Sequence, residues 1–374
     1  MASEHAALLK DSVTDFVTRG TDIARVRALR GTPGEYDRKL WRQMADLGWL
    51  GVAIPESYGG MGLGLSEAAI VAEGLARSLT PEPYTASAVL AAGALVASDN
   101  EALKSDLLPR IVSGELLLAL AWQEQPGTLD TRQFALQATP FEGGYRLNGT
   151  KRYVMGAAGA DAYLVAGQSD AGLVLACVDR DAAGVSAEYQ PLADGRQFGT
   201  LTFRDTVVPR ERIAASGASA SAALERALDH ASAIAGAELY GVLSRALDMS
   251  VDYMKTRVQF GKPIGSFQAL QHRAVDLYIQ QQLASATLDD GLRELDRDPA
   301  PQARAAIASR LKARCSDAGV RITREAIQIH GAIGFTDEYD AGLYLKRALV
   351  LAAWLGNGAQ HRRRYAALTL NKEG

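Results

Sequence analysis

The sequence has 374 residues, with 40 basic and 43 acidic side chains and a formal net charge of −3. Hydrophobic residues make up 48% of it and charged residues 22%, so the chain can bury a sizeable core and is not a disordered tail. The near-neutral balance of charges argues against nucleic acid as a partner, because proteins that bind nucleic acid present a basic face.

Cysteine and histidine side chains are few and scattered. Cys177 and Cys315 stand far apart, which argues against a disulfide scaffold or a zinc knuckle and favours a reducing cytoplasm. No two of the five histidines have the i, i+4 spacing of a helical metal site, so we expect no metal. Residues Met1–Lys10 lack the apolar segment of a secretory signal, and no apolar run reaches the ~20 residues of a membrane span. We therefore predict a cytoplasmic protein whose chemistry comes from a bound cofactor or from carboxylates.

Spaced apolar positions such as Leu40, Met44 and Leu47 predict helices in residues 1–115. A glycine-rich run, Gly59–Gly64, lies between them. Leu65 stands where a G-x-G-x-x-G motif requires its third glycine, and no strand precedes the run, so we expect no dinucleotide-binding site there. We interpret this run as a loop that shapes the domain.

Residues 116–215 have a different pattern of short runs rich in β-branched and aromatic residues, separated by turn signals. The pair Asn148-Gly149 between alternating runs is typical of a hairpin turn. Strands at this spacing predict an antiparallel barrel or sandwich, and the helical period then returns in residues 216–374. The predicted domains are therefore helical (1–115), β (116–215) and a helical bundle (216–374). The predicted strands cover residues 115–123, 134–141, 145–155, 161–167, 173–178 and 198–208.

This order of domains, together with five local motifs, resembles the acyl-CoA dehydrogenase flavoprotein family over essentially the whole chain. The resemblance implies a mainly α fold in which two helical domains flank a small antiparallel β-barrel domain. It also implies FAD as the cofactor, an acyl-CoA substrate, an electron-transfer acceptor, and assembly into an oligomer. The motifs are Leu47–Gly62, Leu147–Lys151, Leu201–Pro209, Arg257–Gln268 and Gln328–Phe335.

Two of these motifs are expected to contact the FAD of a neighbouring subunit. Arginine is suited to bidentate recognition of phosphate, and glycine permits close approach of a flat or phosphorylated ligand. The resemblance places Arg257, Phe260 and Gln268 on that FAD, with Arg257 near the pyrophosphate. It places Gln328, Gly331 and Gly334 beside the adenosine half. The alternatives are a helix-capping arginine and a bare glycine-rich turn.

The positions that a subunit of this family uses at its own flavin differ here. Gln123 occupies the position of a threonine that hydrogen-bonds the flavin, and its amide can still donate and accept. Tyr153 replaces a tryptophan on the flavin face. Met155 replaces the threonine or serine that bonds flavin N5, and it has no good donor. Gln123, Tyr153 and Met155 are therefore candidate cofactor-binding residues with altered chemistry.

The catalytic base is absent from both positions that the family uses. The reaction removes an α-proton with a carboxylate, which must lie within hydrogen-bond reach of the substrate in a dry pocket. The resemblance aligns Leu355 with the more common glutamate position and Ala231 with the alternative one. Neither side chain can accept a proton.

One carboxylate falls on the apolar stripe of the helix predicted over residues 222–255. Glu238 is the single charge between Ala231 and Ser244, and a carboxylate on a buried face is costly unless it is paired or protonated. Three interpretations remain open: a structural glutamate paired with Arg or Lys of a neighbouring helix, a catalytic base, or polar recognition of the acyl chain.

Three functions follow from this pattern. In the first, the chain is an FAD-linked acyl-CoA dehydrogenase with an atypical base, either as a homo-oligomer or as one subunit of a heteromer. In the second, it is a catalytically inactive partner that completes the FAD site of a related chain. A flavin monooxygenase of the same fold is a weaker alternative. The second function fits the observation that the retained residues are those expected to reach another subunit's FAD.

Overall fold

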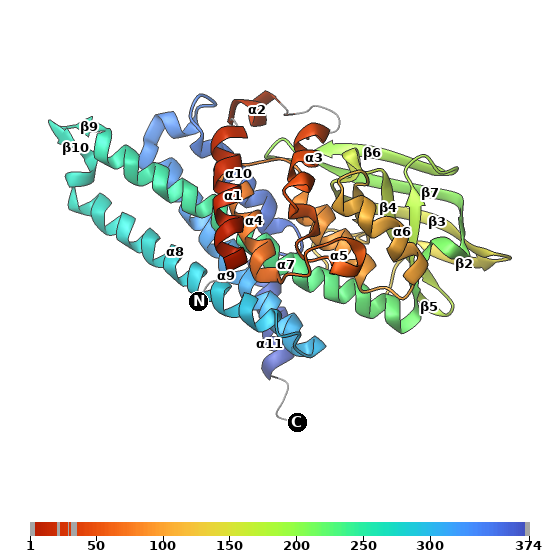
Figure 1. The fold of residues 1–374 in the computed structure, drawn as a ribbon. Coiled ribbons are helices and arrows are strands. Elements are labelled where there is room, and N and C mark those ends of the chain that lie inside the picture. Colours follow the sequence, from red (N-terminus) through yellow and green to blue (C-terminus); the bar gives the residue numbers. More distant parts are fainter. Residues whose placement is uncertain (1–3, 21–22, 29, 31–35, 371–374) are drawn as a thin grey trace. The chain divides into compact units, whose positions relative to one another are not determined.

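The computed structural model describes residues 4–20, 23–28, 30 and 36–370, and most of its regular structure is helical, as predicted (Figure 1). The chain forms two compact units. The first comprises Met1–Arg27, Ala69–Thr80 and Ser232–Gly374, and the second comprises Ala28–Ala68 and Pro81–Ala231. The described α-helices are α1 (Glu4–Gly20), α2 (Ile23–Ala28), α3 (Arg38–Asp46), α4 (Leu65–Arg77), α5 (Ala92–Val96), α6 (Glu101–Val112), α7 (Gly217–Thr256), α8 (Gln268–Leu295), α9 (Pro301–His330), α10 (Ala341–Ala353) and α11 (Gly358–Leu370).

The second unit contains an 8-stranded sheet with the order β6-β7-β3-β2-β4-β5-β8 and β1 beside β4. The pairings of this sheet are antiparallel, as predicted, except for β1 with β4 and β2 with β4, which are parallel. Within the described residues the sheet is a path with β6 and β8 at its ends, and no closed barrel is found. The strands are β1 (Leu118–Ala121), β2 (Gln137–Phe141), β3 (Gly144–Met155), β4 (Ala162–Ser169), β5 (Gly172–Asp179), β6 (Val185–Pro191), β7 (Gln197–Pro209) and β8 (Ile213–Ser216).

The Asn148-Gly149 pair lies inside β3 and forms no hairpin turn, which corrects the prediction. The turn between β2 and β3 lies at Gly143, where the φ angle is +87°. At Gly149 the pairing of β3 with β7 shifts register, φ is +142°, and a Cβ atom would stand 2.7 Å from the Cα of Leu136. The glycine here therefore serves a β-bulge at a close backbone approach, which gives the same sequence signal as a turn.

The Gly59–Gly64 run folds back on the residues that precede it. The N–H of Met61 donates to the Gly51 carbonyl at 2.8 Å, and the N–H of Gly62 donates to the Ile54 carbonyl at 2.9 Å. A Cβ on Gly60 would stand 2.0 Å from the Ile54 oxygen. These N–H groups are used inside the unit, which agrees with the interpretation of the run as a structural loop.

The first unit is a helical bundle around α9, which packs against α8, α10 and α11. Its core contains Leu239 and Val242 of α7 and Ile322 of α9, all fully buried. A Cβ on Gly241 would stand 2.3 Å from the Glu73 carbonyl oxygen, so glycine permits α7 and α4 to cross closely. A two-stranded hairpin, β9 (Val258–Gln259) with β10 (Lys262–Pro263), connects α7 to α8 (Figure 1).

Candidate functional site

The hairpin after α7 presents the first group of predicted cofactor-binding residues. Arg257 follows α7 directly, and its backbone is fixed by its N–H to the Tyr253 carbonyl and by its carbonyl to the Ile264 N–H, both at 2.8 Å. Its side chain is exposed, as is that of Gln268, the first residue of α8. Phe260 at the hairpin tip has a φ of +54° and is 91% exposed. Exposed phenylalanine and arginine side chains at one short hairpin are typical of a surface that another molecule covers.

The C-terminal end of α9 presents the second group. Gln328 is exposed on α9, and Gly331 ends the helix with a φ of +63° and open space where a Cβ would stand. Gly334 differs, because a Cβ there would stand 2.9 Å from the Ile327 carbonyl oxygen. The sequence Gln328–Gly334 therefore combines an available amide with backbone that a ligand can approach.

Three aromatic side chains connect these two groups. The ring centroid of Tyr253, one turn before Arg257, lies 4.5 Å from that of His330, and the rings of His330 and Tyr339 lie 4.6 Å apart. His330 Nδ1 donates to the Ala326 carbonyl at 2.7 Å, so Nε2 accepts from the Tyr339 hydroxyl at 2.9 Å. Burial lowers the pKa of His330, which favours this neutral tautomer. The end of α7 and the end of α9 are thereby held side by side.

Gln123, Tyr153 and Met155 come together in the other unit. The Arg152 N–H donates to the Gln123 carbonyl at 2.7 Å, at the point where β3 shifts its register against β7. Tyr153 has a φ of +57°, and its ring meets Phe198 edge-on with centroids 5.9 Å apart. The Gln123 amide donates to the Gln125 carbonyl at 2.9 Å, and Met155 is buried. The structure thus groups the three residues at a β-bulge.

A buried ion pair holds the segment that carries Gln123, and no local pattern in the sequence predicts it. Lys151 Nζ is fully buried and donates to Glu124 at 2.6 Å and to the Trp122 carbonyl at 3.0 Å. Burial lowers the pKa of Lys151 to about 8, although Glu124 opposes this shift. Burial also tends to raise the pKa of Glu124, but hydrogen bonds from Lys151 and from the Ala135 and Leu136 N–H groups bring it below its usual value.

Glu238 is occupied by an ion pair between two helices of the first unit. Its carboxylate lies 2.6 Å from the guanidinium of Arg347 on α10, and the two side chains are 12% and 5% exposed. Ala231 is completely buried, and Leu355 is buried with a φ of +56°. Of the three interpretations of Glu238, the ion pair is the one that these contacts support.

The backbone around Leu355 is fixed from the protein interior by two residues that the sequence analysis missed. Lys312 of α9 is fully buried, and its Nζ lies 2.9 Å from each of the Leu351 and Gly356 carbonyl oxygens. His361 of α11 donates from Nε2 to the Leu355 carbonyl at 2.7 Å. Because the last carbonyls of a helix lack partners within it, Lys312 acts as a C-terminal cap of α10. Burial lowers the pKa of Lys312 to about 7 and that of His361 to about 3.

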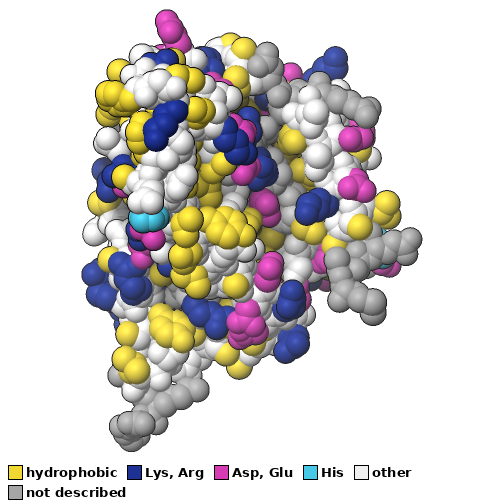
Figure 2. All heavy atoms as spheres, turned by 90° about the vertical axis from the view of Figure 1, so that its left-hand side faces the viewer, with side chains coloured by type: hydrophobic (Ala, Val, Ile, Leu, Met, Phe, Trp, Pro, Cys, Tyr) yellow, Lys and Arg dark blue, Asp and Glu magenta, His cyan; other side chains and the backbone are white. Residues whose placement is uncertain are grey.

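A row of exposed hydrophobic side chains follows α8. Val275, Tyr278, Ile279 and Leu283 are each about half exposed and have helical spacing along one face. Figure 2 views the side of the molecule on which α8 lies in Figure 1 and shows hydrophobic side chains gathered between charged ones. A contiguous apolar face of this kind is typical of contact with another protein chain.

FAD fits the residues at the ends of α7 and α9 better than the residues at the β-bulge of β3. The exposed Arg257 and Gln328, with the open backbone at Gly331, offer the donors and the approach that a phosphorylated, aromatic ligand requires. At the β-bulge the fit is weaker, because Met155 is buried without a donor and one N–H of the Gln123 amide already donates to the Gln125 carbonyl. No group of three His, Cys, Asp or Glu side chains comes together to hold a metal in the part of the chain that the structure describes. Among the described helices, none is both long and apolar enough to cross a membrane.

Comparisons with known proteins agree with this architecture. The chain matches the family model for the acyl-CoA dehydrogenase N-terminal domain over residues 3–115 and the model for the acyl-CoA dehydrogenase C-terminal domain over residues 214–369. It is 32% identical over 369 residues to the acyl-CoA dehydrogenase IpdE2 of Mycolicibacterium smegmatis, covering 98% of this chain and 99% of the relative.

Two solved structures are also similar over their full length. The ChsE4-ChsE5 complex from Mycobacterium tuberculosis is 29% identical, with a TM-score of 0.90 and coverage of 100% of this chain and 99% of that one. A variant of the Tcur3481-Tcur3483 steroid ACAD is 31% identical, with a TM-score of 0.89 and coverage of 99% of both chains. The resemblance drawn from the motifs is thereby confirmed, and this protein belongs to the acyl-CoA dehydrogenase family.

Proposed function

We propose that this chain is the subunit of a heteromeric, FAD-dependent acyl-CoA dehydrogenase that completes the FAD site of a related chain, which supplies the catalytic carboxylate. The observation that carries this proposal is the ion pair of Glu238. Glu238, the one carboxylate of α7 between Ala231 and Ser244, is bound to Arg347 at 2.6 Å, and the two family base positions hold the apolar side chains of Leu355 and Ala231.

The surface residues support a contribution to a flavin held elsewhere. Arg257, Phe260, Gln268 and Gln328 are all exposed, and the Tyr253–His330–Tyr339 cluster fixes the two chain segments that carry them. In the proposed role Arg257 binds the pyrophosphate, and Gln328 and the backbone at Gly331 contact the adenosine half. When bound, FAD accepts the hydride that leaves the β-carbon of the acyl-CoA.

The residues at this chain's own β-bulge support the same proposal. Met155 stands where a hydroxyl would bond flavin N5, and the Gln123 amide is directed to the Gln125 carbonyl. A subunit that holds a reactive flavin would retain these donors. The exposed apolar face of α8 adds a surface for assembly. The ChsE4-ChsE5 and Tcur3481-Tcur3483 structures are each named for two different chains, which makes a heteromer a precedent among similar proteins.

The test is to purify the chain alone and after co-expression with a related acyl-CoA dehydrogenase from the same genome that carries glutamate at the position matching Leu355. Flavin absorbance per chain, assembled mass and acyl-CoA-dependent reduction of a ferrocenium acceptor are measured on both samples. We expect no activity from the chain alone, and flavin and activity in a stoichiometric complex. A yellow homo-oligomer with one FAD per chain that reduces the acceptor would overturn the proposal and favour an active enzyme.

A further inference from the structure

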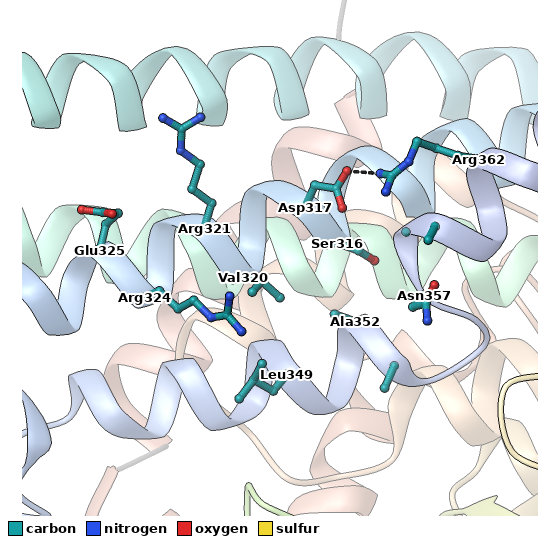
Figure 3. A pocket seen from close by; sticks show the side chains of 13 residues that line it. Ser316, Asp317, Val320, Arg321, Arg324, Glu325, Leu349, Ala352, Asn357 and Arg362 are labelled. Atoms are coloured by element: carbon teal, nitrogen blue, oxygen red, sulfur yellow. Dashed lines mark hydrogen bonds and ion pairs between the residues drawn. The ribbon is translucent and has the colours of Figure 1, made fainter.

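A groove of about 710 Å³ runs between α9, the end of α10 and the start of α11 (Figure 3). Its apolar lining includes Val320 of α9 and Leu349 and Ala352 of α10. Leu349 is 38% exposed, although it has the hydrophobic side chain of a core residue. The groove therefore offers an apolar floor that is open to solvent.

Arginine side chains border this floor, and two of them carry uncompensated charge. Arg362 pairs with Asp317, and Glu325 pairs with Arg273 at 3.1 Å, so both acidic groups of the groove are neutralised. Arg321 and Arg324 are exposed and form no ion pair with any side chain that the structure describes. Figure 3 shows the Arg324 guanidinium over the space between α9 and α10, while Arg321 extends from α9 on the side away from α10.

The two arginines and Gln328 share one side of α9 by their spacing, although the side chains of the two arginines diverge. Arg321, Arg324 and Gln328 follow the i, i+3, i+7 spacing, so Gln328, the residue proposed to reach another subunit's FAD, lies about 10 Å along the helix from Arg321 and just beyond the groove residue Glu325. If that proposed function holds, the second chain passes directly beside the groove. The inference below therefore rests on the proposed function.

The charges determine which chain can occupy this surface. A twofold contact between identical subunits brings one patch against the same patch of the other copy. In a twofold contact centred on the groove, Arg321 and Arg324 would face a second pair of arginines, and the groove's acidic groups are already used. Like charges across an interface oppose association, whereas opposite charges steer and select a partner.

We propose that the arginine groove binds acidic side chains of the second, related acyl-CoA dehydrogenase chain, and that Arg321 and Arg324 select this heteromeric contact over self-pairing. Arginine is suited to this role because its planar guanidinium forms two parallel hydrogen bonds with a carboxylate. An elongated, open groove with an apolar floor fits a segment of a protein chain, whose hydrophobic side chains would cover Leu349 and Val320.

The test uses the full chain co-expressed with the related, glutamate-bearing chain described above. Arg321→Glu/Arg324→Glu is compared with Arg293→Glu/Arg363→Glu, which makes the same change of charge at two exposed arginines outside the groove. Circular dichroism and thermal unfolding check that each variant is folded, and Arg324→Ala serves as a milder substitute. The dissociation constant of the complex is measured by analytical ultracentrifugation at low and high salt.

We expect the groove variant to weaken the complex by roughly tenfold or more and to reduce its salt dependence, while the control binds like the original chain. We also expect Arg321→Ala/Arg324→Ala, alone in solution, to self-associate at lower concentration than the original chain. A complex that forms equally well with the groove variant would overturn the groove assignment and leave the proposed function standing. Absence of any heteromer, with an active homo-oligomer in its place, would overturn both. Tight binding of inorganic pyrophosphate that Arg321→Glu/Arg324→Glu abolishes would also overturn the assignment and identify a small-anion site.

Discussion

The carboxylate of Glu238 and the guanidinium of Arg347 lie 2.6 Å apart in the interior of the helical unit, where the two side chains are 12% and 5% exposed. The pair joins α7 to α10 and explains why a charge occurs on an otherwise apolar face of α7. Breaking a buried pair by removing one partner leaves an uncompensated charge, whereas replacing both partners together can be almost neutral. The pair therefore specifies how the two helices dock, and its stability effect depends on which member is changed.

Replacing Arg347 alone should be more harmful than replacing both members of the pair. Arg347→Met leaves the Glu238 carboxylate buried without this partner, and we expect it to lower the free energy of unfolding by about 3–5 kcal/mol. Glu238→Gln/Arg347→Met should recover a large part of that loss. Urea unfolding of the two single variants and the double variant gives the coupling energy of the pair. Additive losses in the double variant would show that the two side chains are independent.

The same variants distinguish a structural from a catalytic Glu238. If the pair is structural, Glu238→Gln in the assembled heteromer should leave the pH profile and the rate of acyl-CoA oxidation unchanged. Loss of turnover with unchanged flavin content and unchanged stability would instead identify Glu238 as the base.

The buried Lys312 predicts that stability rises with pH above neutrality. Burial lowers the pKa of Lys312 to about 7 in the folded chain, whereas in the unfolded chain its pKa lies near the ordinary lysine value of 10.5. Between these values the unfolded state binds the extra proton, so unfolding becomes less favourable as pH rises, by at most ~1.4 kcal/mol per pH unit. We expect the stability of the original chain, measured by urea unfolding from pH 7 to 9.5, to rise relative to that of Lys312→Met.

This comparison isolates Lys312 because Lys151, whose pKa is also lowered, is present in both proteins. Stability curves that stay parallel over this range would show that Lys312 remains protonated in the folded chain. Lys312→Met also removes the donor to the Leu351 and Gly356 carbonyls, and this loss is the same at every pH.

His361 predicts the same direction of pH dependence in the acidic range, where stability falls as pH falls. Burial lowers its pKa to about 3, Nε2 donates to the Leu355 carbonyl, and Nδ1 has no hydrogen-bond partner among the described residues. The unfolded chain takes up the proton near pH 6.5, so the contribution of His361 to stability is complete above that pH and is lost progressively as pH falls toward 3. His361→Gln keeps an N–H donor that cannot titrate. We expect the stability of this variant to fall less steeply than that of the original chain between pH 6.5 and 4.5. Equal slopes would contradict the assigned neutral state.

The spacing of apolar residues predicts the helical segments and places Glu238 on the buried face of its helix, because both depend on local spacing. The burial of Glu238 follows from the 3.6-residue period of the helix. Its partner Arg347 is 109 residues away in the sequence, and no local pattern relates the two. Lys312 and His361 were missed for the same reason, since their partners are carbonyl groups, which every residue has. The strands β6 and β8 were missed because β6 has no buried residue and β8 has only four residues directly before the helical region. Gly149 gave a turn signal in a strand, because a bulge and a turn both select glycine.

Arg257 should affect flavin retention without affecting the fold. Its backbone bonds survive any side-chain change, and its exposed guanidinium makes no ion pair with another side chain in the described ranges. In the heteromer we expect Arg257→Ala to reduce the flavin retained after gel filtration by roughly tenfold or more, with an unchanged unfolding temperature. Arg257→Lys should restore only a small part, because lysine cannot form the bidentate contact to a pyrophosphate.

Arg293→Ala, at an exposed arginine of α8, is the matched control and should retain flavin like the original complex. Flavin retention measured by absorbance distinguishes loss of the cofactor from loss of the chemical step. An Arg257→Ala complex that keeps its flavin but turns over slowly would show that Arg257 contacts the substrate instead. A complex in which Arg257→Ala and Arg293→Ala behave identically in both measurements would show that Arg257 does not contact the bound molecules. The hairpin would then serve assembly alone, through Phe260, and Phe260→Ser should dissociate the chains while Arg257→Ala does not.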